Sequence, residues 1–166
     1  MSLTARISAG IDRIVDAFGL LAAACCFALV AVMATNVLLR YLFSTGSVWA
    51  QELEWHLLVP ICLLGMGYAI RHGEHVRVDI FFASYPERLK VAIDLFAAIL
   101  GMLFGVVVII LAWRYVGQSW RIDEGSANPG GIPWRWALKA IIPLGFAIFT
   151  LQSLADALRA VERLRT

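Results

Sequence analysis

The stretch VWAQELEWHLLVPICLLGMGYAI, residues 48–70, joins a polar beginning to a long apolar remainder. Its first nine residues contain the carboxylates Glu52 and Glu54 and the imidazole of His56. The fourteen residues after His56 carry no charged side chain, which is typical of a helix inside a membrane. The pattern therefore predicts a membrane helix whose polar first turns lie near the bilayer surface.

The composition of the whole chain extends this prediction. Of its 166 residues 61% are hydrophobic and 16% are charged, whereas soluble domains are usually about 45–50% apolar and about 25% charged. The sequence contains four long apolar runs. Each would be ~29–35 Å long as a helix, which matches a hydrocarbon core of about 30 Å. None alternates with a period of two, which disfavours a β-barrel. We expect an all-α integral membrane protein, one domain over residues 1–166, with spans at about 18–39, 49–70, 91–113 and 136–154.

Charge and amphipathicity predict how the chain meets the membrane. Nine of the fourteen Lys and Arg residues lie in the two tails and the second loop, which places these parts in the cytoplasm by the positive-inside rule. In the N-terminal tail apolar residues recur at helical spacing from Leu3 to Phe18, and residues 154–166 are similar. Both tails are therefore expected to form interfacial amphipathic helices.

Several short patterns predict turns, packing and interface contacts. Residues 128–131, Asn-Pro-Gly-Gly, are a strong turn signal. The segment Trp134-Arg135-Trp136 is typical of an aromatic belt, and Lys139 is placed to snorkel to the surface. The GxxxG pattern of residues 101–105 permits close helix packing but is also common by chance. Two readings of Asn36 remain open: it bonds to a neighbouring helix or to lipid headgroups, or it is an ordinary interface anchor.

The charged residues suggest little chemistry of their own. Glu52 and His56 are four residues apart and share a helix face, so they form either a proton-handling pair or a salt-bridged interface pair. A bis-histidine haem would need a second histidine in a facing span, and this is missing. The three cysteines form no metal-ligand pattern. Charges at mid-membrane usually mark a substrate path, and their absence argues that this chain does not transport alone.

Three functions of different classes remain at this point. The first is a non-catalytic subunit that supports a transporter. The second is a membrane anchor for a haem or quinone redox complex, and the third is a stand-alone small exporter. The net charge of +2 suggests no nucleic-acid partner.

A series of motifs gives the chain a family resemblance. In order, they are RYLF (40–43), WAQELEW (49–55), GEHVRVDIFF (73–82), SANPGGIPWRWALKAIIPLGF (126–146) and LQSL (151–154). They are spread over residues 40–154, and the resemblance covers nearly the whole chain. In this order they resemble the small four-span subunit of the tripartite ATP-independent periplasmic (TRAP) transporters.

The resemblance implies a function in the bacterial inner membrane with both termini cytoplasmic. The small subunit would bind a large, sodium-coupled membrane subunit that carries organic acids, and would offer a periplasmic surface to a soluble substrate-binding protein. No catalytic, substrate or metal residue and no cofactor is expected in this chain, since sodium would bind the large subunit. The candidates for structural or partner-interface roles are Arg40, Trp49, Glu52, Glu54, His56, His75, Asp79, Trp134, Arg135 and Lys139.

The two carboxylates of the second span yield a specific expectation. Glu52 and Glu54 are 160° apart on an ideal helix, so they cannot bind the same neighbour. We expect one to bind a basic group of this chain, with Arg40 the nearest in the first loop. The other is expected to face headgroups or the large subunit.

Overall fold

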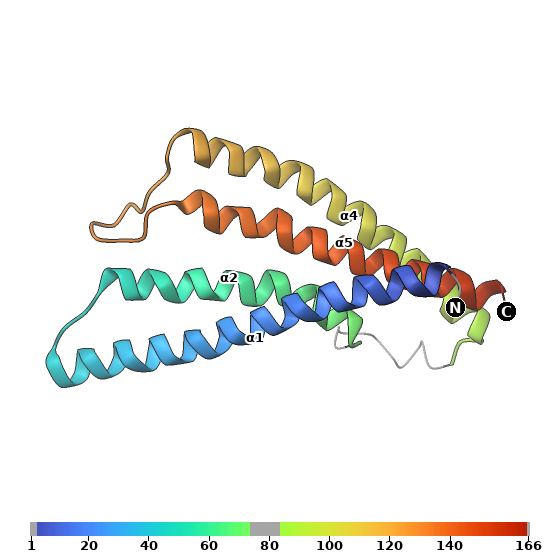
Figure 1. Cartoon of the computed structure of the whole chain (residues 1–166), viewed down its shortest axis with the longest axis horizontal. Coiled ribbons are helices and arrows are strands. Elements are labelled where there is room, and N and C mark those ends of the chain that lie inside the picture. Colours follow the sequence, from blue (N-terminus) through green and yellow to red (C-terminus); the bar gives the residue numbers. More distant parts are fainter. Residues whose placement is uncertain (1–2, 74–83, 166) are drawn as a thin grey trace.

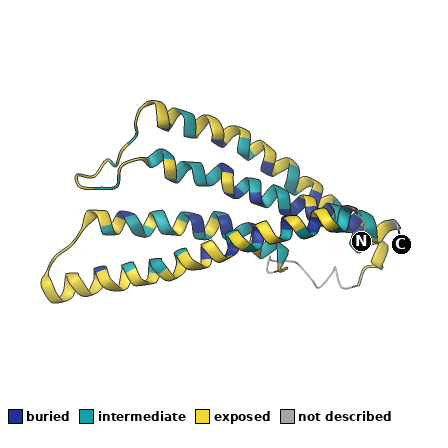
Figure 2. Cartoon of the chain, in the orientation of Figure 1, coloured by how far each residue is buried: buried dark blue, intermediate teal, exposed yellow. Residues whose placement is uncertain are grey.

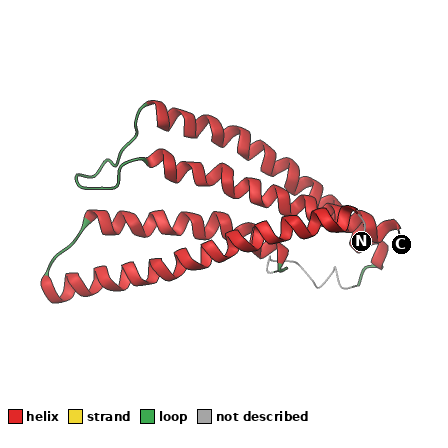
Figure 3. Ribbon diagram, viewed as in Figure 1, coloured by secondary structure: helices red, strands yellow, loops and turns green. Residues whose placement is uncertain are grey.

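The computed structural model describes residues 3–73 and 84–165, and these form four α-helices. They are α1 (Leu3–Phe43), α2 (Val48–Arg71), α4 (Glu87–Arg121) and α5 (Arg135–Arg165) (Figure 1). No strand occurs in these two ranges (Figure 3). All four helices are long and apolar enough to cross a membrane. The predicted all-α, four-helix membrane fold is confirmed.

Local sequence signals explain where the helices begin and end. Ser47 caps α2 by accepting a hydrogen bond from the Ala50 backbone N–H at 3.3 Å. α4 ends in a Schellman-type turn, in which Asp123 has φ 46° and the Glu124 N–H donates to the Ser119 carbonyl. Two prolines, Pro60 and Pro143, lie inside continuous helices.

The helices form two hairpins joined through α5. α1 and α2 make one hairpin, α4 and α5 the other, and α5 packs against each of the other three helices (Figure 1). The connections 44–47 and 122–134 lie at one end of the molecule, here called the loop end. Both chain termini lie at the opposite, terminal end, where the Thr4 hydroxyl bonds to Glu162.

Small residues allow these helices to approach closely. A Cβ atom added at Gly145 of α5 would lie 2.8 Å from the carbonyl oxygen of Leu63 in α2, so the two backbones are in contact. In α4, Gly101 and Gly105 face the side chains of Ser153 and Thr150 of α5, whose hydroxyl groups leave no room for a Cβ atom. The GxxxG pattern is therefore a real packing site between α4 and α5.

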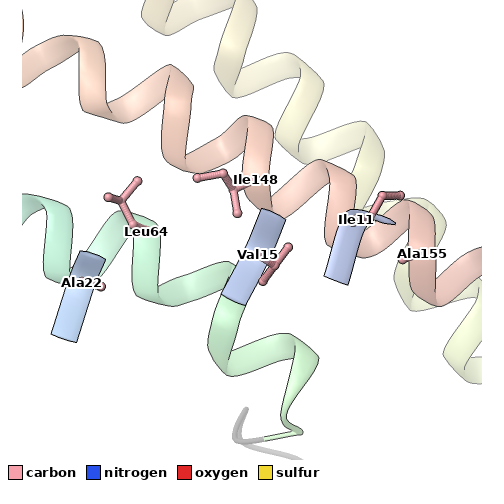
Figure 4. Close-up of a cluster of buried hydrophobic side chains, with 6 residues drawn as sticks. All are labelled: Ile11, Val15, Ala22, Leu64, Ile148 and Ala155. Atoms are coloured by element: carbon pink, nitrogen blue, oxygen red, sulfur yellow. The ribbon is translucent and has the colours of Figure 1, made fainter. Parts of the chain in front are cut away.

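The buried core lies toward the terminal end. It contains residues from three helices, Ile11, Val15, Ala22, Leu64, Ile148 and Ala155 (Figure 4). Two of these come from the N-terminal segment that was expected to be an interfacial helix. That segment is continuous with the rest of α1, and its apolar side packs with residues of α2 and α5.

The outer surface of the bundle is apolar. The outward sides of α1 and α4 are largely exposed (Figure 2), with side chains such as Phe27 and Phe96 in the open. A water-soluble monomer rarely exposes so large an apolar surface. Lipid or another membrane protein must cover these helices.

Candidate functional site

Within residues 3–73 and 84–165, the charged residues lie in two layers, one at each end of the bundle. No charged residue occurs in residues 17–39, 57–70, 95–113 or 140–155, which are the middles of the four helices. The loop-end layer includes Glu52, Glu54, Glu124, Arg135 and Lys139. The candidate site is therefore built at the helix ends and not at mid-membrane.

Glu52 is the centre of the loop-end layer. Its side chain is only 7% exposed and accepts hydrogen bonds from the Ser126 hydroxyl, the Asn128 amide at 3.1 Å and the Ile132 backbone N–H at 2.7 Å. The Arg135 guanidinium lies 3.6 Å from the same carboxylate. One side chain of α2 thus fixes the loop from Ser126 to the beginning of α5.

The predicted turn at residues 128–131 makes this arrangement possible. The Gly131 N–H donates to the Asn128 carbonyl at 3.1 Å, and Gly130 has φ 79°, as a type II turn with Pro129 requires. Gly131 also has no room for a side chain, because a Cβ there would lie 2.6 Å from Glu52 Oε2. The turn prediction is confirmed, and its glycines bring the loop backbone onto the carboxylate.

The predicted partners of the two carboxylates need correction. Glu52 and Glu54 do bind different neighbours, but the basic group beside Glu52 is Arg135 and not Arg40. Glu54 accepts a hydrogen bond from the Asn36 amide at 3.0 Å, which confirms the expected bond from Asn36 to a neighbouring helix. Arg40 is exposed at the end of α1.

The predicted side-chain pair between Glu52 and His56 is wrong in both of its forms. His56 Nδ1 lies 2.7 Å from the backbone carbonyl of Glu52, not from its carboxylate. The carboxylate is already occupied by donors from the 122–134 loop. His56 Nε2 is buried and has no hydrogen-bond partner among the described residues.

A second contact closes the loop on the α4 side. Lys139 bonds to Glu124 of the loop and lies 4.0 Å from the centre of the Tyr115 ring. The snorkelling of Lys139 to the membrane surface stays a prediction. The hydrogen bond from Lys139 lowers the pKa of Glu124 below its usual value of 4.5. The Arg135 N–H also donates to the Glu124 carbonyl at 3.0 Å.

The tryptophans of the loop end are divided between packing and exposure. Trp136 packs edge-on against Trp120, with ring centroids 4.4 Å apart. Trp134 is 63% exposed and Trp49 is 51% exposed. Trp120 is itself 61% exposed, and the aromatic belt of Trp134 and Trp136 stays a prediction.

The terminal end carries an ion-pair cluster that the motifs did not predict. Arg71 of α2 contacts Asp12 and Asp16 of α1, and Arg159 of α5 contacts Asp12 and Asp156. Asp12 and Asp16 are four residues apart on α1, a spacing that signals one charged helix face. Two candidates of the second loop, His75 and Asp79, lie outside the described residues.

These groups do not form a catalytic or metal site in the part of the chain that the structure describes. No three His, Cys, Asp or Glu side chains come together there to hold a metal. A crevice of about 800 Å³ opens at the terminal end and is lined from all four helices, including Arg71, Phe149 and Asp156. The charged groups at the two ends of the bundle join helices and fix a loop.

Comparison with known proteins agrees with this architecture. Residues 29–163 match the family model described as "Tripartite ATP-independent periplasmic transporters, DctQ component". The chain is 27% identical over 142 residues to the C4-dicarboxylate TRAP transporter small permease protein DctQ of Vibrio cholerae, covering 74% of this chain and 61% of that protein. It is 30% identical over 139 residues to the ectoine TRAP transporter small permease protein TeaB of Halomonas elongata, covering 78% and 68%.

A third match has a different extent. The chain is 25% identical over 118 residues to the sialic acid TRAP transporter permease protein SiaT of Haemophilus influenzae, covering 69% of this chain but 18% of that protein. The match to the Vibrio cholerae protein spans less than two thirds of its length. The chain belongs to the DctQ family of TRAP transporter components, whose members are transporter subunits and not enzymes.

Proposed function

We propose that the chain is the small membrane subunit of a sodium-coupled, binding-protein-dependent transporter of organic acids. In this proposal it is a scaffold for a large transport subunit and forms part of the periplasmic surface on which a soluble substrate-binding protein docks. The transport path and the sodium sites belong to the large subunit. The chain lies in the bacterial inner membrane with both termini in the cytoplasm.

The observation that carries this proposal is the charge-free middle of all four helices. Coupling ions and anionic substrates need polar or charged groups near mid-membrane, and such groups are expensive to keep there without a function. Here the ion pairs lie at the two ends, while the middle is joined by glycine and apolar contacts. Ion pairs at the ends and close apolar packing in the middle are suited to a supporting subunit without a transport path of its own.

Features of the chain and of its relatives support the proposed large subunit and the proposed class of substrate. The match to the Haemophilus influenzae permease covers only 18% of that protein, so a segment similar to this chain is joined there to a much longer remainder. The apolar outer sides of α1 and α4 offer surface for such a partner. Two of the relatives are named for C4-dicarboxylates and sialic acid, which favours organic acids as the substrate class.

Co-expression with the large permease subunit of the same transporter tests the proposal. We expect a tag on this chain to retain the large subunit through detergent purification. Deleting this chain should abolish sodium-dependent uptake into cells, and restoring it should recover uptake. Failure to co-purify together with uptake that survives the deletion would overturn the proposal, as would transport by this chain alone in liposomes.

A further inference from the structure

The crevice at the terminal end crosses the level at which the charged layer meets the charge-free middle of the helices. It has a volume of about 800 Å³, and both α2 and α4 line it, although these two helices do not pack extensively against each other in the described residues. Along α5 its lining extends from Phe149 to Arg163, a length of about 21 Å as helix. The crevice therefore connects the membrane surface with the hydrocarbon interior.

The two parts of this crevice have different linings. The inner part lies in the charge-free segments of α4 and α5, and small or apolar side chains dominate it, among them Ala97, Ala98, Gly101 and Phe149. The outer part is charged and contains Asp12, Arg71, Asp94, Asp156, Arg159 and Arg163. These six residues supply three guanidinium groups and three carboxylates. The site is thus apolar at its inner end and charged but electrically neutral at its outer end.

The size and polarity of the crevice restrict what can occupy it. A transmembrane helix about 10–12 Å across would need roughly twice the available volume over the same length, so it could not enter. A small polar solute would leave the inner part without an apolar partner. A phospholipid has an acyl chain for the inner part and a charged headgroup for the outer part, and charged pockets between membrane helices are suited to headgroups.

The charges of the outer part favour one class of headgroup. An anionic headgroup would meet as many carboxylates as guanidinium groups, so attraction and repulsion would largely cancel. A zwitterionic headgroup offers a phosphate to the guanidinium groups and an ammonium to the carboxylates. Arg159 already binds Asp12 and Asp156, but a guanidinium has five N–H donors and can bind a carboxylate and a phosphate together.

The donors of the ammonium make a further distinction between zwitterionic lipids. The primary ammonium of ethanolamine has three N–H donors, like that of lysine, and can hydrogen-bond to a carboxylate. The quaternary ammonium of choline has none and offers only its charge. The carboxylates of the outer part, such as Asp94 and Asp156, therefore favour ethanolamine.

We propose that the terminal-end crevice binds one phosphatidylethanolamine molecule. Its acyl chain lies along Ala97, Gly101 and Phe149, and its headgroup lies among the guanidinium and carboxylate groups of the outer part. In this position α2, α4 and α5 hold the lipid together. The inference does not depend on the transported substrate or on the large subunit, so its failure would leave the proposed function standing.

Native mass spectrometry of the purified full chain tests the selectivity of the site. Phosphatidylethanolamine, phosphatidylcholine and phosphatidylglycerol with identical acyl chains are each added to the same detergent, and the lipid retained by the chain is counted. We expect one phosphatidylethanolamine per chain, retained several-fold more than either of the other lipids. Equal retention of all three would overturn the inference, because it would indicate unselective contact with the apolar outer surface.

A substitution in the outer part tests the contribution of its carboxylates. In Asp94→Asn the retention of phosphatidylethanolamine should fall several-fold, toward that of phosphatidylcholine, because the ammonium loses a charged acceptor. The matched control is Asp123→Asn, which makes the same change in an exposed residue of the loop end and should leave retention unchanged. Equal retention in both variants would overturn the assignment of the headgroup to this site.

A substitution in the inner part tests the position of the acyl chain. Ala97→Phe fills the crevice without changing any charge, and Ala97 is exposed, so the core should tolerate the larger ring. We expect this variant to lose the retained lipid, whereas Leu103→Phe on the exposed surface of α4 should keep it. Circular dichroism checks that both variants keep their helices. A folded Ala97→Phe variant that retains as much phosphatidylethanolamine as the parent chain would overturn the inference.

Discussion

The two ends of the bundle use charge in different ways. At the loop end a nearly buried carboxylate, Glu52, is surrounded by neutral donors and one arginine that all come from a single loop and its junction with α5. At the terminal end Arg71 of α2 binds two carboxylates of α1, and Arg159 of α5 binds one carboxylate of α1 and one of its own helix. The side chains involved are 22–44% exposed. The first arrangement defines a backbone shape, whereas the second neutralises helix ends that lie side by side.

Because of this difference, the two ends should respond differently to substitutions and to ionic strength. Short hydrogen-bonded contacts to a buried group depend on geometry and little on the solvent. Partly exposed ion pairs are weakened by salt and contribute modestly to stability. We therefore expect the loop end to be sensitive to single substitutions and the terminal end to be sensitive to ionic conditions.

Removing the central carboxylate should have the largest effect. In Glu52→Ala three hydrogen-bond donors lose their acceptor, and unsatisfied donors are costly where water cannot replace it. Backbone amides of residues 126–132 should then exchange with deuterium much faster, while residues 6–18 stay unchanged. The matched control is Glu54→Ala, which removes only the bond from Asn36 and should leave the loop protected. Equal exchange in both variants would contradict the central position of Glu52.

Breaking the terminal-end cluster should have a moderate effect. Arg159→Met leaves Asp12 and Asp156 without this partner, and we expect a loss of about 1–2 kcal/mol in the free energy of unfolding. Thermal unfolding in detergent measures the loss, and hydrogen exchange should locate it at the terminal end. Exchange that increases in residues 126–132 instead would show that the two ends are coupled.

Salt should separate the two ends without any substitution. Raising the ionic strength from about 0.05 M to about 0.5 M shortens the Debye length and screens exposed pairs. Amides of residues 6–18 should exchange faster at high salt, and those of residues 126–132 should change little. A loop end that loosens as much as the terminal end would refute the proposed difference.

The smallest effect should come from acid at the α4 side of the loop. The pKa of Glu124 is lower in the folded chain than its usual value of 4.5. The contact with Lys139 therefore contributes its full stabilisation of the fold above pH 4.5, and this contribution is lost as the pH falls through the lowered pKa. Amide exchange near Glu124 should therefore rise on acidification. Glu124→Gln should remove this pH-dependent part, and a variant with an unchanged acid response would argue against the assignment.

The fold was predictable from the sequence because apolar run length and composition are local properties. The turn at residues 128–131 was equally readable, since proline and glycine have strong conformational preferences. The partner of Glu52 was not, because Arg40 is twelve residues away in sequence whereas Arg135 comes near only when α5 packs on α2 and the loop folds across it. Long-range packing decides such contacts, and the helical periodicity of a sequence does not predict which helices pack together.

The same limit explains the other corrections. The spacing of Glu52 and His56 places them on one helix face, but the Glu52 carboxylate accepts hydrogen bonds from the loop, and His56 contacts the Glu52 backbone carbonyl instead. Lys139 was expected to extend to the membrane surface, and in the structure its amine contacts Glu124 and the ring of Tyr115. In each case a neighbour that is distant in sequence offered a better contact than the one predicted locally.

The unequal lengths of the charge-free segments have a consequence for the surrounding bilayer. Residues 17–39 of α1 form an uninterrupted run of about 34 Å, and residues 57–70 of α2 one of about 21 Å. A hydrocarbon layer of about 30 Å is too thin for the first and too thick for the second. Lipid around the isolated chain must therefore change in thickness from one side of the α1–α2 hairpin to the other, at a cost that rises with each ångström of mismatch. A protein partner that covers the α1–α2 hairpin removes this cost, so membrane thickness itself favours assembly on that hairpin.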